Sequence, residues 1–133
     1  MASGSEGAEA GTLIVDIDGT LCDIKRAGQA YAEVEPRREM IAKLREYQAR
    51  GYRILLFTSR NMRTYNNSLG MINKHTAPVL LEWLARWDVP YDEILFGKPW
   101  ARDKGFYVDD RTVRPDEFLS MSEEDIQRLL GRE

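Results

Sequence analysis

Four short apolar runs, separated by polar stretches with helical periodicity, constrain the fold more than any other feature. The runs cover about Leu13–Ile17, Arg53–Thr58, Glu93–Phe96 and Phe106–Asp110, and they are rich in β-branched and aromatic residues. Such runs predict buried strands. Helices between strands predict parallel pairing with right-handed crossovers. We therefore predict an α/β fold: a three-layer, Rossmann-like domain whose mostly parallel sheet has helices on both faces.

Three helices are expected around this sheet. The first follows Pro36 and stops near Gly51, with an apolar face formed by Met40, Ile41, Leu44 and Tyr47. The second begins near Thr76 and Pro78, with an apolar face formed by Val79, Leu80, Trp83, Leu84 and Trp87. Ser122 has capping-box spacing and starts a C-terminal helix to about Leu130. The long polar stretch Asn61–Thr76 predicts a functional loop, and Cys22–Glu35 a loop or short flap.

Composition limits the class of protein. A chain of 133 residues, 43% of them hydrophobic, suits one domain with one core. We assign residues 12–133 to that domain and expect residues 1–11, which lack the features of a signal peptide, to form a disordered tail. A net charge of −3 argues against a general nucleic-acid binder. A single cysteine fits a reducing cytoplasm, and no apolar run approaches the length of a membrane span.

Polar residues follow every predicted strand. Asp16 and Asp18 end the first run, and the later runs end in Thr58-Ser59-Arg60, in Gly97-Lys98-Pro99 and in Asp109-Asp110. Ligands of parallel α/β sheets bind at the carboxyl ends of the strands. The four sets of side chains therefore predict one site at one edge of the sheet.

Converging carboxylates need a cation, because their mutual repulsion otherwise raises their pKa values. No basic residue lies closer along the chain to Asp16 and Asp18 than Lys25, so we expect the neutralising charge to come from outside the chain. Oxygen ligands without cysteine or histidine favour Mg²⁺, which commonly shares its coordination with a phosphate. Lys98 and Thr58 suit phosphate oxygens. Asp16 is then a candidate nucleophile, and Asp18, on the same side of an extended chain, a candidate general acid and base.

Plainer interpretations exist for several of these residues. Asp16 and Asp18 could stabilise a turn, but they do not form an EF-hand loop, because the apolar run before them and the glycine position do not match. Lys98 could be a surface lysine, and Asp109-Asp110 a solvated turn. His75 fits a structural or solvent-facing role. The sequence leaves open whether Trp100 lines the site.

The motifs "DIDGT", "LLFTS", "GKP" and "YVDD", in this order and each tied to an apolar run, resemble those of the haloacid dehalogenase superfamily. The resemblance covers most of the chain from Leu13 to Asp110. It implies that Asp16 is the nucleophile and a metal ligand, and that Asp18 is the general acid and base. An acidic residue at the Asp18 position is typical of the superfamily's phosphatases and phosphotransferases.

The same resemblance assigns the remaining roles. It implies that Thr58 and Lys98 bind the transferring phosphoryl group together with Gly19 and Ser59. It also implies a Mg²⁺ ion held by Asp16, by the main-chain carbonyl of Asp18, by Asp109 directly and by Asp110 directly or through water. The gaps between the motifs are too short for an inserted cap domain, so we expect a capless core. Residues that follow the second motif would then contact the leaving group: Arg60, Asn61, Asn67 and His75.

A narrower resemblance rests on "SRNM", "INKHT", "PYDEILFGKPW" and "FYVDDR", which are similar to phosphatases of capsular polysaccharide biosynthesis. It implies a sugar phosphate or polyol phosphate as substrate. Two alternatives stay open: a phosphatase for nucleotides or nucleic-acid ends, and a non-catalytic regulator that keeps the fold. We expect a small phosphorylated substrate as partner, no nucleic acid and no membrane, and we leave self-association into a homo-oligomer open.

Overall fold

The computed structural model describes residues 10–131, so most of the predicted N-terminal tail lies outside the described residues. The chain divides into two compact units: the first ends at Trp100 and the second begins at Ala101. No helix in the described part of the chain combines the length and apolar character needed to cross a membrane.

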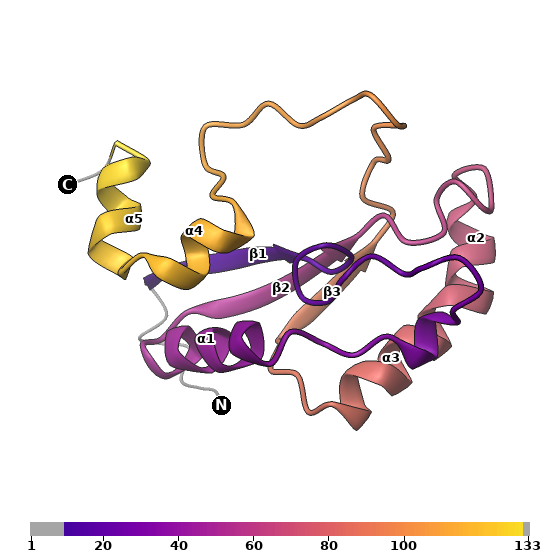
Figure 1. The fold of residues 1–133 in the computed structure, drawn as a ribbon, viewed down its shortest axis with the longest axis horizontal. Coiled ribbons are helices and arrows are strands. Elements are labelled where there is room, and N and C mark those ends of the chain that lie inside the picture. The colour runs from indigo at the N-terminus through magenta and orange to yellow at the C-terminus, as the bar shows by residue number, and fades with distance from the viewer. Residues whose placement is uncertain (1–9, 132–133) are drawn as a thin grey trace. The chain divides into compact units, whose positions relative to one another are not determined.

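The first unit is built on a parallel sheet of three strands in the order β1-β2-β3. The strands are β1 (Thr12–Asp16), β2 (Arg53–Thr58) and β3 (Glu93–Phe96). Asp16 pairs with Phe57, and Thr58 with Phe96, so the strands end side by side. The α/β class and the first three strands are therefore confirmed, and the carboxyl ends of these strands share one edge (Figure 1).

Two helices, α1 (Arg38–Ala49) and α3 (Ala77–Arg86), lie on the same side of this sheet (Figure 1). The strand order explains the arrangement. Right-handed crossovers that step twice in the same direction place both connecting helices on one face. A short helical turn, η2 (Tyr31–Glu33), precedes α1 in the segment predicted to be a loop or flap.

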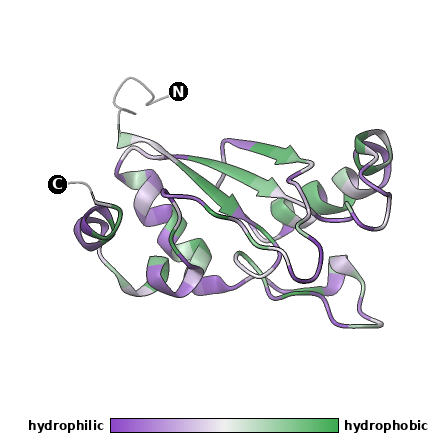
Figure 2. Cartoon of the chain, turned by 90° about the horizontal axis from the view of Figure 1, so that it is seen from above, coloured by the Kyte–Doolittle hydropathy of each residue, from purple (hydrophilic) through white to green (hydrophobic). Residues whose placement is uncertain are grey.

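The hydrophobic core fills the space between the sheet and these helices. Ile54 and Leu56 point into it from β2, Met40 and Leu44 from α1, and Trp83 from α3, and each of these side chains is at most 1% exposed. Burying a side chain of this size stabilises the fold by about 1.5–3 kcal/mol. Figure 2 shows the matching concentration of hydrophobic residues along the strands.

Not every residue of the predicted apolar faces is buried. Leu80 and Leu84 lie in the core beside Trp83, but Val79 is 43% exposed. The prediction for Val79 was wrong, because that residue lies on the outer side of α3. On the sheet, Ile14 and Leu95 point away from the helices and are 67% and 49% exposed. Within the first unit, helices thus cover one face of the sheet, and the three-layer arrangement stays a prediction.

The predicted loop Asn61–Thr76 is half helical. After turns up to Asn67, the chain forms α2 (Leu69–Met71) and the π-helical η3 (Ile72–Thr76), which runs directly into α3. Ser68 caps this helix: its Oγ accepts a hydrogen bond from the Met71 amide at 3.3 Å. The helix thus begins several residues earlier than the sequence pattern predicted.

The second unit contains α4 (Pro115–Ser120) and α5 (Glu123–Leu129). The predicted cap is confirmed, since Ser122 Oγ accepts a hydrogen bond from the Asp125 amide at 3.1 Å. The strand predicted over Phe106–Asp110 is wrong: residues 105–109 form no regular structure, and Phe106 and Val108 are 79% and 89% exposed. A strand needs a paired neighbour, and the described residues of this unit contain no other strand.

Candidate functional site

Asp16 and Lys98 meet at the carboxyl edge of the sheet. Asp16 is the last residue of β1, Lys98 follows β3, and the Nζ of Lys98 lies 3.3 Å from Oδ1 of Asp16. The other oxygen of Asp16, Oδ2, accepts a hydrogen bond from the Thr20 hydroxyl at 3.3 Å. The Lys98 amide donates to the carbonyl of Thr58 at 3.0 Å, which fixes the lysine backbone against β2. Three residues that the sequence assigned to one site therefore lie together.

Burial raises the pKa of Asp16 above its ordinary value. The positive charge of Lys98 opposes this shift, and the negative charge of Asp18 adds to it. Lys98 therefore provides the main local compensation for a carboxylate that has lost much of its water. An anionic, partly desolvated oxygen held beside a fixed ammonium group is a suitable nucleophile for phosphorus.

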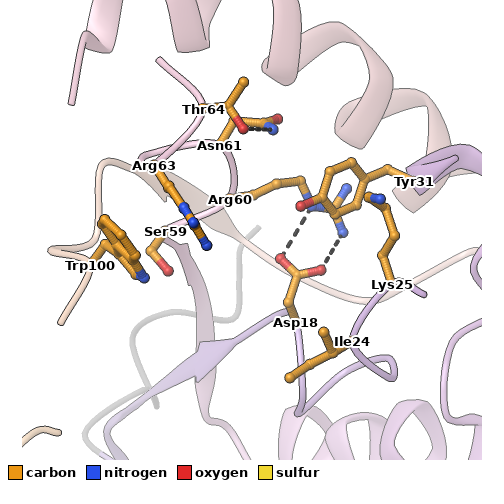
Figure 3. Close-up of a pocket in the computed structure, with 10 residues that line it drawn as sticks. All are labelled: Asp18, Ile24, Lys25, Tyr31, Ser59, Arg60, Asn61, Arg63, Thr64 and Trp100. Atoms are coloured by element: carbon orange, nitrogen blue, oxygen red, sulfur yellow. Dashed lines mark hydrogen bonds and ion pairs between the residues drawn. The ribbon is translucent and has the colours of Figure 1, made fainter. Parts of the chain in front are cut away.

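Asp18 is held by Arg60. The guanidinium donates two hydrogen bonds, from Nη2 to Oδ1 at 2.9 Å and from Nε to Oδ2 at 3.2 Å (Figure 3). The Arg60 side chain is 2% exposed and that of Asp18 is 24% exposed, so the pair is largely shielded from water. The expectation that the neutralising charge for Asp16 and Asp18 comes from outside the chain was wrong. The fold supplies a cation to each carboxylate.

Arg60 also contacts Tyr31 and Thr58. Its guanidinium carbon lies 4.2 Å from the centre of the Tyr31 ring, a cation–π arrangement. Its backbone amide donates to Oγ1 of Thr58 at 3.0 Å, and Thr58 is 1% exposed. Arg60 is thus a buried wall residue whose Nε and Nη2 bind Asp18, whereas its buried Nη1 has no hydrogen-bond partner among the described residues. Whether it also contacts a leaving group, as the sequence suggested, stays a prediction.

A pocket of about 250 Å³ opens beside Asp18. Of the predicted site residues, it is lined by Asp18, Ser59, Arg60 and Asn61. Trp100 lines it as well, which answers the question that the sequence left open. The remaining lining residues were not predicted: Ile24, Lys25, Tyr31, Arg63 and Thr64. Their signal in the sequence was weak, because Lys25 and Tyr31 come from the segment predicted only as a loop or flap.

The other predicted substrate residues have different surroundings. The Asn61 side chain donates to Thr64 Oγ1 within its own turn at 3.2 Å and accepts from Oγ1 of Thr76, the last residue of η3, at 2.7 Å. Asn67 and His75 do not line the pocket. His75 is exposed and stacks on Tyr65 with ring centres 5.6 Å apart. Contact of Asn67 and His75 with substrate stays a prediction.

The loop after β1 is shaped by Gly19. Its φ of +90° is a conformation that side-chain-bearing residues rarely adopt, and its amide donates to the carbonyl of Cys22 at 2.7 Å. This tight turn keeps the backbone after Asp18 close to the strand end. Phosphate binding by Gly19 and Ser59 stays a prediction.

The metal-binding prediction depends on both units. Asp16 offers a carboxylate of the hard-oxygen type that Mg²⁺ prefers. Both carboxylate oxygens of Asp18 are engaged by Arg60, and the ligand predicted from this residue is its main-chain carbonyl. Asp109 and Asp110 belong to the second unit, where Oδ1 of Asp109 accepts from the Arg111 amide at 2.9 Å. Within residues 10–131, no three side chains of His, Cys, Asp or Glu gather into a group that could hold a metal ion. A shared metal between Asp16 and these two residues therefore stays a prediction.

Comparison with known proteins gives one close relative. No family model matches the chain, and no curated protein matches it. A crystal structure of a structural-genomics target from Vibrio cholerae is 52% identical, with a TM-score of 0.86 over 90% of this chain and 96% of that chain. This chain belongs to the same family as the Vibrio cholerae protein. The name of that relative states no activity, so the similarity supports the fold of this family and leaves its chemistry to the residues of the site.

Proposed function

We propose that this protein is a phosphomonoester hydrolase of the haloacid dehalogenase type, which acts through an aspartyl-phosphate and uses Mg²⁺. The observation that carries the proposal is the pairing of Asp16 with Lys98 at the carboxyl edge of a parallel sheet. The hydrogen bond from the Lys98 amide to the Thr58 carbonyl at 3.0 Å brings the second and third motifs together, which supports the proposal.

In the first step, an oxygen of Asp16 attacks phosphorus while the bond from phosphorus to the leaving oxygen breaks. Lys98 holds the phosphoryl oxygens beside Asp16 and offsets their charge. Asp18 enters this step carrying a proton, gives it to the leaving oxygen and is left as the carboxylate that acts as base in the second step. The product of this step is a phosphorylated Asp16 and a free alcohol.

In the second step, Asp18 removes a proton from water, and the water oxygen attacks phosphorus and releases Asp16. Arg60 holds Asp18 in a fixed orientation for both steps. Oδ2 of Asp18 accepts one hydrogen bond from Arg60 and keeps a further lone pair for the proton, whereas Oδ1 accepts from Arg60 and also from the Cys22 thiol at 3.8 Å. The role of Arg60 is therefore to position Asp18.

For the metal, we propose Asp16, the main-chain carbonyl of Asp18, Asp109 and Asp110 as the residues that would hold Mg²⁺. A bound Mg²⁺ supplies positive charge that polarises the phosphoryl group. We further propose a three-layer, capless domain in the cytoplasm, in keeping with the apolar residues Ile14 and Leu95 on the outer face of the sheet and with the free cysteine Cys22. A sugar or polyol phosphate, in surface polysaccharide synthesis, is the proposed substrate.

Hydrolysis of an aryl phosphate tests this function. The wild-type protein should turn over the ester with Mg²⁺, lose activity with chelator and regain it with added metal. Asp16→Asn should abolish turnover, and Asp18→Asn should lower it by about 10²- to 10⁴-fold. Asp88→Asn is the matched control, since the Asp88 side chain is 93% exposed. Full activity of Asp16→Asn, or indifference to chelator, would refute the proposal.

A further inference from the structure

The pocket beside Asp18 carries an excess of positive charge. Its one carboxylate, Asp18, is paired with Arg60. Lys25 and Arg63 also line it, and among the described residues no carboxylate lies within ion-pair distance of either. The pocket wall therefore holds two cations that no acidic side chain within residues 10–131 compensates.

Aromatic rings hold these two cations in place. Lys25 Nζ lies 5.5 Å from the centre of the Tyr31 ring, and the Arg63 guanidinium carbon lies 5.6 Å from the Trp100 ring. Figure 3 shows Arg63 and Trp100 on one side of the pocket and Lys25 and Tyr31 on the other, with Asp18 between them. Cation–π contacts orient a charge without neutralising it. Both charges thus stay available to an anion in the pocket.

The pocket lies on the leaving-group side of the reaction. Under the proposed function, Asp18 exchanges a proton with the leaving oxygen, so the leaving group must lie beside Asp18. Asp16 and Lys98, which would hold the phosphoryl group, are not among the lining residues. The positive charges of Lys25 and Arg63 therefore face the alcohol part of the substrate, and the phosphate to be cleaved is held elsewhere.

We propose that the preferred substrate is a phosphate monoester whose leaving group carries its own negative charge, and that Lys25 and Arg63 select it. The charge is a carboxylate, as in a phosphorylated sugar acid, or a second phosphate. This inference rests on the proposed function and narrows its substrate class. Tyr31 adds a phenolic hydroxyl to the pocket wall, and burial, followed by the charge of Asp18, raises its pKa above its ordinary value.

Matched substrate pairs test the proposal. Glycerol 3-phosphate and 3-phosphoglycerate differ by a carboxylate, and fructose 6-phosphate and fructose 1,6-bisphosphate by a second phosphate. The wild-type protein should show a higher kcat/KM for the charged member of at least one pair by roughly tenfold or more. Added salt should reduce this ratio. The pair with the larger ratio tells whether a carboxylate or a phosphate is preferred.

Lys25→Gln and Arg63→Gln should each lower the ratio of kcat/KM between the charged and the neutral substrate of a pair. Lys43→Gln is the control: this lysine lies on α1, outside the pocket, and its loss should leave the ratio unchanged. Equal kcat/KM within both pairs, or ratios untouched by the two pocket variants, would overturn the proposal. Ligand binding to the Asp16→Asn variant, measured by calorimetry, tests the selection of charged ligands separately from the proposed catalytic function. Tighter binding of the charged ligands would support the pocket assignment even if the wild-type protein hydrolyses nothing, and equal binding would overturn it.

Discussion

The guanidinium of Arg60 contacts both carboxylate oxygens of Asp18, although 42 positions separate the two residues in the chain. Because both side chains are largely buried, removing one partner leaves an uncompensated charge. Breaking a buried pair in this way lowers the free energy of unfolding by about 3–5 kcal/mol. Because Asp18 is partly exposed, we expect Arg60→Met to lower it by about 2–4 kcal/mol. Urea unfolding measures it.

The control for this variant is Arg45→Met. Arg45 pairs with Asp88 at 3.2 Å on the surface, and exposed pairs contribute about 1 kcal/mol or less. A double-mutant cycle of Arg60→Met with Asp18→Asn isolates the pair itself. A coupling energy near zero would show that Arg60 stabilises the fold by packing alone and would remove its role in positioning Asp18.

Gly97 determines how the chain reaches Lys98. Its φ is +85°, and a Cβ there would lie 2.7 Å from Cδ2 of Leu69. Leu69 is 53% exposed and can move aside, so the cost of Gly97→Ala comes mainly from the backbone and should be about 1–2 kcal/mol. Urea unfolding of Gly97→Ala with and without Leu69→Ala checks this. If Leu69→Ala removes the loss, the side-chain contact is responsible and the backbone explanation is wrong.

Cys22 should be inert in the native protein. The thiol is 0% exposed, and burial, with a further contribution from Asp18, raises its pKa to about 12. A raised pKa keeps the thiol protonated at every lower pH, and the thiolate is the reactive form. At about pH 8, a thiol reagent should label the native protein at least ~10²-fold more slowly than the unfolded chain. Because the chain has one cysteine, prompt labelling of native protein would contradict this environment directly.

Much of the first unit follows from local sequence patterns. Strand β2 was predicted to the residue, and the convergence of Asp16 with Lys98, 82 positions away, follows from the rule that parallel strands share their carboxyl ends. The Asp18–Arg60 pair was missed because proximity was judged along the chain, whereas the fold brings adjacent strand ends together. The early helix start at Leu69 was missed because Ser68 was not recognised as a cap.

Other features depend on tertiary contacts that a sequence pattern does not contain. The run Phe106–Asp110 has the composition of a strand, but a strand forms only with a partner, and hydrophobicity alone does not specify one. The residues of the pocket wall also depend on tertiary contacts: Lys25, Tyr31 and Arg63 come from loops and a short helical turn without periodicity, and only the fold places them around Asp18.

Trapping the covalent intermediate tests the central claim most directly. The protein is mixed with an aryl phosphate and Mg²⁺, quenched in acid within the first turnover, digested and analysed by mass spectrometry. Phosphorylation of Asp16 is predicted to add one phosphoryl group to the peptide that contains Asp16, and Asp16→Asn should abolish the adduct while Asp18→Asn prolongs its lifetime. Steady turnover without any adduct on that peptide, or an adduct that persists in Asp16→Asn, would contradict the account.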